Sequence, residues 1–286
     1  MPQNPAVRAN GDFTVECEGC RLHARLRGDG SPVLLIQGVG LHGDGWIPQV
    51  NALASRHQCL TFDNRGMAAS QPLGGELSIE QMAADALALM DACEWRSAHV
   101  IGHSMGGLIA QQLALSAPKR VRSLALLCTF GRGKDATKLT PFMFWVGLRT
   151  RIGTRRQRRH AFLQIVLPPT MHGSADLDAL AEKFAPIFGH DLADHSPVEM
   201  KQLSAMSRYD ATPRLKELNG IPTLVVSAEH DPIASPQSGR IIADGIPGAR
   251  FVEIAGASHG IPVYEPDRIN SLLLEHLARV ESGATA

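Results

Sequence analysis

Two hydrophobic patterns alternate along this chain. Short runs such as PVLLIQG (residues 32–38), CLTF and HVIG are apolar almost throughout, which is typical of strands buried on both faces of a parallel sheet. Between them lie stretches with apolar residues at helical spacing, such as SIEQMAADALALMDAC, where Ser78 and Gln81 have the spacing of a capping box. This alternation predicts an α/β fold with a mostly parallel central sheet and helices on both faces.

Residues 131–215 interrupt the alternation. They contain only helix-type patterns, and the last of these begins after Ser196 and contains Glu199, so that the two residues have the spacing of a capping box. Strands and helices then alternate again in PTLVVSA, QSGRIIADGI, ARFVEIA and PDRINSLLLEHLARV. We therefore expect residues 1–130 and 216–286 to form the α/β core, and residues 131–215 to form an all-helical lid inserted after the sixth strand.

A hairpin is predicted before the first buried strand. FTVEC and RLHARL both alternate like strands on either side of Glu18 and Gly19. The flanking Cys17 and Cys20 read C-x-x-C, a spacing also found in zinc and redox sites. Because a structural zinc site needs four ligands and no second such pair follows, we favour a plain hairpin turn and expect no metal.

The composition is that of an ordinary globular protein, with 286 residues, 44% hydrophobic and 20% charged. Lysine plus arginine equals aspartate plus glutamate at 28 each, so no net charge favours nucleic acid or an anionic membrane. No apolar run approaches the roughly 20 residues of a membrane helix, the first residues lack a signal-peptide pattern, and five cysteines fit a reducing compartment. We expect a cytoplasmic protein that acts on a small molecule without a cofactor, and the sequence leaves its oligomeric state open.

The stretch HVIGHSMGGLIAQQLA places Ser104 among glycines between an apolar strand and a helix. It matches G-x-S-x-G, in which the serine sits on a sharp, strained turn at the end of a strand. Gly102 and Gly106 would let the strand and helix backbones approach closely, because no Cβ atom stands between them. Ser104 is therefore the candidate nucleophile, and it needs a base and an orienting carboxylate to be activated.

The base and the acid are sought where strands end, because functional groups of parallel sheets gather at the carboxyl ends of the strands. His259, in FVEIAGASHG, follows the last strand, and Asp231, in TLVVSAEHD, follows the strand before it. The chain order Ser104, Asp231, His259 is the one expected for this architecture.

Two backbone amides are expected to stabilise a developing oxyanion. One is the amide of Met105, directly after the candidate nucleophile at the start of a helix. The other is the amide of Val39, where Gly38 lets the chain turn back after PVLLIQ.

Other titratable residues compete for these roles. His103 adjoins Ser104, but neighbours on a strand point to opposite faces, so we expect it beneath the sheet, and His230 fails for the same reason. His42 is expected to be a solvated loop residue, and Asp135 is a weaker alternative acid because seven residues separate it from its strand. Surface positions are expected for the histidines of the lid and the last helix, namely His172, His190, His195 and His276.

Together these motifs resemble the α/β-hydrolase superfamily over nearly the whole chain apart from the lid. GHSMGG resembles its nucleophile elbow, FDNRGMAAS its segment after the fourth strand, and AGASHGIPVYEPDRIN the segment that carries its histidine. The resemblance implies that Ser104 is the nucleophile, His259 the base and Asp231 the acid. Two positions depart from the family pattern, since Gln37 stands where a histidine is common and Ala68 where a glycine is.

The triad and the resemblance favour a serine hydrolase that cleaves a small carboxylic ester or lactone through an acyl-enzyme. The same triad also serves cofactor-free perhydrolysis or haloperoxidation and the hydrolysis of carbon–carbon bonds, and a non-enzymatic ligand receptor can be built on the same fold. Turnover of a substrate separates the enzymes from the receptor.

Two features of the lid each allow two interpretations. Its aromatic and apolar residues either line a pocket or pack the lid onto the core, and these are Phe142, Met143, Phe144, Trp145 and Phe162. Its arginines either attract an anionic substrate or form a solvated helix face. We favour the solvated face, because successive residues of a helix are rotated by about 100° around its axis, so adjacent arginines cannot all point into one cleft. The arginines concerned are Arg149, Arg151, Arg155, Arg156, Arg158 and Arg159.

Overall fold

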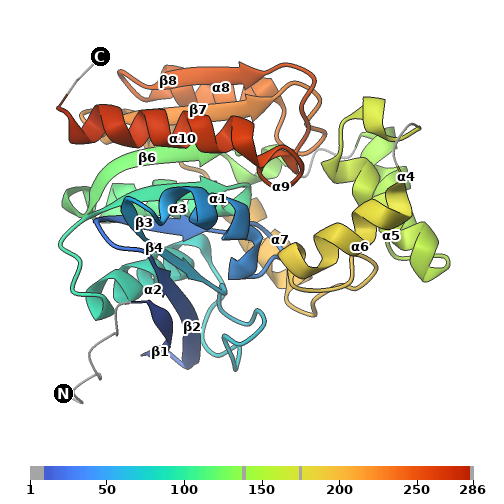
Figure 1. Cartoon of the computed structure of the whole chain (residues 1–286), viewed down its shortest axis with the longest axis horizontal. Coiled ribbons are helices and arrows are strands. Elements are labelled where there is room, and N and C mark those ends of the chain that lie inside the picture. Colours follow the sequence, from blue (N-terminus) through green and yellow to red (C-terminus); the bar gives the residue numbers. More distant parts are fainter. Residues whose placement is uncertain (1–9, 137–139, 174–175, 284–286) are drawn as a thin grey trace.

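The computed structural model describes residues 10–136, 140–173 and 176–283, with an eight-stranded sheet at the centre (Figure 1). The strand order is β1-β2-β4-β3-β5-β6-β7-β8, with β1 and β2 antiparallel at one edge and every pair from β4 to β8 parallel. The strands are β1 (Gly11–Cys17), β2 (Cys20–Arg27), β3 (Ser31–Ile36), β4 (His57–Phe62), β5 (Ala98–His103), β6 (Val121–Leu127), β7 (Thr223–Ala228) and β8 (Arg250–Ile254). The predicted fold class is confirmed.

The predicted hairpin turn is also confirmed. Glu18 and Gly19 join β1 to β2 with φ values of 33° and 78°, a backbone region that glycine enters at little cost. Cys17 and Cys20 face each other across the hairpin and are both buried free thiols. Burial raises the pKa of the Cys17 thiol to about 11, so this thiol is neutral and unreactive at physiological pH.

Helices cover both faces of the sheet. One face carries α2 (Ile79–Ala92), α3 (Met105–Ser116) and α8 (Pro236–Gly245), and the other carries α1 (Ile47–Leu53) and α10 (Pro266–Glu281). Successive strand residues point to opposite faces, so Leu34 and Ile36 of β3 join the first core and Val33 and Leu35 join the second. This explains why the parallel strands are apolar throughout.

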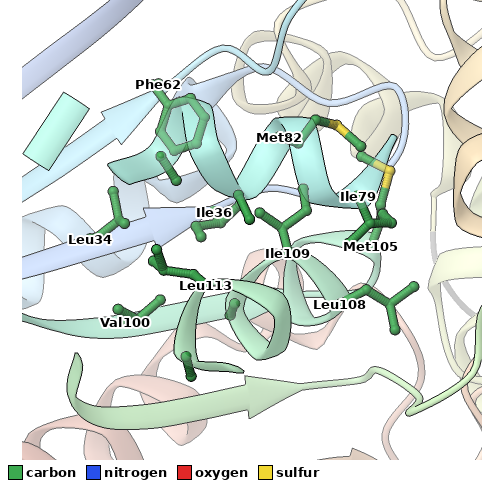
Figure 2. Close-up of a cluster of buried hydrophobic side chains, with 14 of the residues drawn as sticks. Leu34, Ile36, Phe62, Ile79, Met82, Val100, Met105, Leu108, Ile109 and Leu113 are labelled. Carbon is green, nitrogen blue, oxygen red and sulfur yellow. The ribbon is translucent and has the colours of Figure 1, made fainter. Parts of the chain in front are cut away.

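Figure 2 shows the core between β3, β5, α2 and α3. Ile36 of β3 lies near Ile109 of α3, Val100 of β5 lies near Leu113, and Met82 of α2 approaches Met105. Met105 is fully buried, and complete burial of such a side chain stabilises a fold by about 1.5–3 kcal/mol. This packing fixes the first residue of α3 beneath the turn that carries Ser104.

The chain between β6 and β7 is helical in its described parts, apart from connecting turns. It forms α4 (Pro141–Arg149), α5 (Arg155–Val166), α6 (Leu177–Phe188) and α7 (Glu199–Arg208). In Figure 1 the helices α4 to α6 stand at one end of the sheet, opposite to the end where both chain termini lie. An isolated antiparallel bridge between Arg132 and Asp210 joins the two ends of this insertion.

The insertion has a small core of its own, which also contacts the α/β part. Leu163 of α5 packs with Phe184 and Phe188 of α6, and Leu41 and Val263 from the α/β part border the cluster. Among the helices of the described residues, none has the length and apolar character needed to cross a membrane.

The structure contains one of the two N-caps predicted from the sequence, at Ser78, but not the one at Ser196. Ser78 caps α2 by accepting a hydrogen bond from the Gln81 amide at 3.1 Å, but the Gln81 side chain does not return to Ser78. The box predicted at Ser196 is wrong, because α7 begins at Glu199 with Val198 as its N-cap. The Glu199 side chain is engaged elsewhere, and its position is described below.

Candidate active site

Ser104 occupies the sharp turn between β5 and α3 that its motif predicts. Its backbone has φ 55° and ψ −122°, a conformation in which a residue with a side chain is strained. The turn is held by hydrogen bonds from the Ser104 amide to the Leu127 carbonyl at 3.0 Å and from Thr129 Oγ1 to the Ser104 carbonyl at 2.6 Å. The surrounding fold therefore stabilises a strained serine at the end of β5.

Glycines make this turn possible. A Cβ atom on Gly102 would lie 2.3 Å from the Gly106 carbonyl oxygen, and one on Gly106 would lie 2.0 Å from the Ile36 carbonyl oxygen. Gly107 is equally restricted, since its Cβ would lie 2.4 Å from Thr129 Oγ1. The close approach of strand and helix expected at Gly102 and Gly106 is present.

The structure brings Asp231 and His259 into contact. His259 Nδ1 donates a hydrogen bond to Asp231 Oδ2 at 2.7 Å, and both residues are buried. The other oxygen, Oδ1, accepts hydrogen bonds from the amides of Ile233 and Ala234 at 2.8 Å each. These bonds hold the carboxylate in place, so it fixes the orientation of the imidazole and leaves Nε2 as the nitrogen that can act as a base.

His103 is buried, but the expected position beneath the sheet is wrong, because it contacts His259 and lines the same cavity as Ser104. Its Nε2 donates to the His259 carbonyl at 3.0 Å, and its ring packs against the rings of His259 and Trp46. Burial, with His259 as a further cause, lowers the pKa of His103 to about 3, so it is a neutral support for His259.

Cys128 is a neighbour of the acid that the sequence did not single out. It is fully buried at the end of β6, with φ 45°, beside Asp231. Burial, reinforced by the Asp231 charge, raises the pKa of this thiol well above its usual range, so it stays neutral. The one feature of the sequence that could have pointed to Cys128 is its position directly after β6.

The loop after β3 approaches Ser104 closely. A Cβ atom on Gly38 would lie 3.0 Å from the Ser104 Cβ, so a larger residue there would crowd the serine. The Gly38 amide donates to Gln37 Oε1 at 3.2 Å, and the Gly40 amide donates to Gln202 Oε1 at 2.9 Å. Between them, the Val39 amide has no acceptor within the described ranges.

Met105 supplies the second expected amide. As the first residue of α3 it has an N–H group that the helix cannot bond, at the positive end of the helix dipole. Gln202, which accepts the hydrogen bond from the Gly40 amide, was not predicted from the sequence. Its signal was that it is a polar residue on the buried side of α7, next to the buried Ala205 and Met206. Met105 directly follows Ser104 along the chain, and Val39 directly follows Gly38, which approaches Ser104.

A cavity of about 260 Å³ lies over these groups. Ser104, His259 and Val39 line it from the α/β part, and Phe162 and Val166 line it from the insertion. Most of its wall is apolar, and Glu199 is its one acidic or basic side chain, histidines apart, among the residues described. Such a cavity suits a small, largely apolar ligand.

The other candidates lie away from Ser104 or have other partners. Asp135 pairs with Arg132 at 2.9 Å, His230 is exposed, and the half-buried His42 packs against His190 at 5.8 Å between ring centroids. The expected surface position is wrong for His276, which is buried in α10, with a pKa lowered by burial to about 4. His195 is partly exposed, with 23% of its side chain accessible, and it also lines the cavity.

Arg155, Arg156 and Arg159 of α5 are paired with aspartates of the insertion. Arg155 lies 2.8 Å from Asp191 and Arg156 lies 2.8 Å from Asp178, and neither arginine borders the cavity. Nearby aspartates therefore compensate the positive charge of these arginines. This favours a solvated helix face over a positively charged entrance that attracts anionic substrates.

The aromatic and apolar residues of the insertion divide between the two interpretations. Phe162 and Met143 line the cavity. Phe142, Phe144 and Trp145 of α4 do neither, because they are 47%, 60% and 58% exposed. Within the described ranges, no cluster of three or more histidine, cysteine, aspartate or glutamate residues could hold a metal ion.

Comparison with known proteins gives one consistent result. A family model described as "alpha/beta hydrolase fold" matches residues 31–266. A protein of Azorhizobium caulinodans that bears the name of a carbamate hydrolase, RutD, is 30% identical over 260 residues, which cover 91% of this chain and 96% of that protein. A protein of Mycobacterium tuberculosis named as a non-heme bromoperoxidase, BpoC, is 30% identical over 268 residues, 89% of this chain and 97% of that one.

Solved structures agree with these sequence matches. The enol-lactonase of Burkholderia xenovorans LB400 superposes with a TM-score of 0.77 at 27% identity, and the match covers 93% of this chain and all of that one (100%). The match therefore extends over the sheet and the insertion together.

Proposed function

Because the chain belongs to the alpha/beta hydrolase family, we propose that it cleaves a small carboxylic ester or lactone through an acyl-enzyme formed on Ser104. The hydrolase class itself follows from its relatives and fold neighbours. The observation that carries the finer proposal is the 2.7 Å bond between His259 and Asp231 in a cavity that Ser104 also lines.

In the first half of the reaction, Ser104 Oγ attacks the carbonyl carbon of the substrate and His259 Nε2 takes the hydroxyl proton. The carbonyl oxygen becomes an oxyanion and accepts hydrogen bonds from the amides of Val39 and Met105. The tetrahedral intermediate then expels the alcohol oxygen, which takes the proton from His259. In a lactone this oxygen stays attached to the acyl chain.

In the second half, His259 removes a proton from a water molecule, which attacks the acyl carbon. The second intermediate collapses, the acid product leaves, and Ser104 Oγ regains its proton from His259. Asp231 stays ionised throughout and stabilises the imidazolium that forms in each half. The neutral His103 supports His259 through its carbonyl and takes no proton.

The substrate proposal rests on the cavity. Its volume of about 260 Å³ and its apolar wall favour a small acyl group, and Phe162 and Met143 would contact that group from above. The insertion then acts as a lid over the reaction. Lactones belong in the first assays because the enol-lactonase shares both the fold and 27% of its residues with this chain.

Labelling with a fluorophosphonate, followed by peptide mapping, tests the proposal. We expect one adduct, on Ser104, and we expect Ser104→Ala to lose both the adduct and esterase activity, by up to about a million-fold in kcat. Labelling at another residue would refute the assignment. A single adduct without turnover of any ester or lactone would favour the ligand receptor.

A second reaction on the same triad is supported by the relative named as a bromoperoxidase. In that reaction the acyl-enzyme transfers its acyl group to hydrogen peroxide in place of water, which releases a peracid and restores the serine. Measuring peracid formation from acetate and peroxide with the wild type and Ser104→Ala would detect it.

A further inference from the structure

Glu199 is an unusual residue in the wall of the cavity. It is the first residue of α7, its side chain is only 16% exposed, and the surfaces around it, such as those of Leu203 and Met206, are largely apolar. A carboxylate in such surroundings is unfavourable unless its oxygens find donors. A carboxylate oxygen without a donor in the protein is therefore free to bind a donor of the substrate.

One oxygen is occupied by the protein. Oε2 accepts a hydrogen bond from His195 Nδ1 at 2.8 Å, while His195 Nε2 faces the Thr150 carbonyl at 3.0 Å. Arg151 approaches the same Oε2 at 3.7 Å from the surface, where it is 48% exposed. Both basic neighbours lie at Oε2, and His195 and Thr150 line the cavity beside Glu199.

The other oxygen has no such partner. Oε1 accepts no hydrogen bond from the described residues, and it lies against Gly40, where a Cβ atom would be only 2.8 Å away. An ionised carboxylate oxygen has two lone-pair positions, so Oε1 can accept up to two hydrogen bonds. Glu199, which lines the cavity, thus carries an accessible oxygen that has no donor among the described residues.

Oε1 also lies close to the reacting groups. Gly38 touches Ser104, Gly40 touches Glu199, and Val39 lies between these glycines. Two residues of extended chain span at most about 7 Å. Ser104, Val39 and Glu199 also line one cavity, so a flexible chain that extends from a carbonyl group at Ser104 can run along its wall towards Glu199.

We infer that Glu199 is a specificity-determining residue that binds a nitrogen donor of the substrate, an amino group above all. This inference rests on the proposed function, since it places the amino group in a substrate whose ester or lactone carbonyl lies at Ser104. A charge-assisted N–H bond to a carboxylate is about twice as strong as a neutral one. The cavity selects amino-bearing esters and rejects those with a second carboxylate, which Glu199 repels.

Matched p-nitrophenyl esters of 6-aminohexanoic and heptanoic acid test this inference, because they differ only by an ammonium group in place of a methyl group. We expect Glu199→Gln, which keeps an acceptor for His195, to lower the ratio of kcat/KM for the amino ester to that for heptanoate at least tenfold. A circular dichroism spectrum and a Tm close to those of the wild type should report that Glu199→Gln is folded. Glu182→Gln removes the same charge from an exposed position on α6 and should leave the ratio unchanged.

A binding measurement keeps the two proposals distinguishable. Isothermal titration calorimetry with n-hexylammonium chloride should detect binding to the wild type and to Glu182→Gln, and at least tenfold weaker binding to Glu199→Gln. An unchanged ester ratio in Glu199→Gln, with turnover that still depends on Ser104, would overturn the subsite and leave the hydrolase proposal standing. If neither ester is turned over, calorimetry decides: binding that depends on Glu199 supports the subsite, and absent or unaffected binding overturns it.

Discussion

Replacing Ser104 by glycine should make the protein more stable while it abolishes ester cleavage. The serine is held at φ 55° and ψ −122°, which glycine adopts far more easily than a residue with a Cβ atom. The substitution should therefore release strain that the folded state now carries. Ser104→Ala is the matched control, because it removes the same hydroxyl group but keeps the Cβ atom and its strain.

The size of the effect can be worked from two opposing contributions. A residue in such a sparsely populated conformation costs about 1–3 kcal/mol, and the extra freedom of glycine in the unfolded chain costs about 0.5–1 kcal/mol. Taken from the middle of these two ranges, the net gain in the free energy of unfolding is about 1 kcal/mol relative to Ser104→Ala. For a chain of 286 residues this corresponds to a rise in Tm of about 2 °C.

Urea denaturation followed by circular dichroism, with Tm from differential scanning calorimetry, measures this difference for the wild type and both variants. The alanine variant corrects for the loss of the hydroxyl group, so the comparison isolates the backbone. If Ser104→Gly is no more stable than Ser104→Ala, the turn carries no strain that a Cβ atom causes, and the reasoning fails.

Three further changes test other parts of the structure. Asp231→Asn should lower kcat by about 10³- to 10⁴-fold because His259 loses its orientation, while Asp135→Asn should leave kcat unchanged, and the reverse result would move the acid to Asp135. Burial lowers the pKa values of His99, His103 and His276 to about 4, 3 and 4, below the value of about 6.5 in an unfolded chain, so the free energy of unfolding should fall as the pH drops from about 6.5 towards 4. Urea midpoints at about pH 7 and pH 5 should differ less in His276→Leu than in the wild type, and an equal difference would contradict the assignment, with the exposed His230→Leu as control. Replacing Cys17 and Cys20 together by serine should leave activity unchanged, and stoichiometric zinc that is present in the wild type and lost in this variant would contradict the hairpin interpretation.

Much of the fold could be predicted from the sequence because its signals are local. Each parallel strand is a short apolar run, since both of its faces are covered, and each helix between them has its own apolar stripe. The candidate site followed from the same regularity. Parallel strands end at one edge of the sheet, so a search directly after each strand found Asp231 and His259, and these two residues are in contact.

The residues that were missed depend on packing between distant segments. Gln202 and Glu199 lie more than 150 positions from the loop they touch at Gly40, and no local pattern sets how α7 lies against that loop. His276 was expected at the surface because histidine is often exposed, but the apolar stripe of α10 carries it into the core. The exposed aromatic residues of α4 show the opposite error, since an apolar helix face does not by itself guarantee a partner in the same chain.

The hydrogen bond from the Gly40 amide to Gln202 has a consequence for how such proteins diversify. It ties the insertion to the loop beside Val39, so the insertion is not an independent module that recombination can exchange without effect. A chimera that receives a foreign insertion here would lose the acceptor for Gly40 together with the carboxylate of Glu199. New specificities are therefore more accessible to this chain by point substitution within α7 than by exchange of the whole insertion.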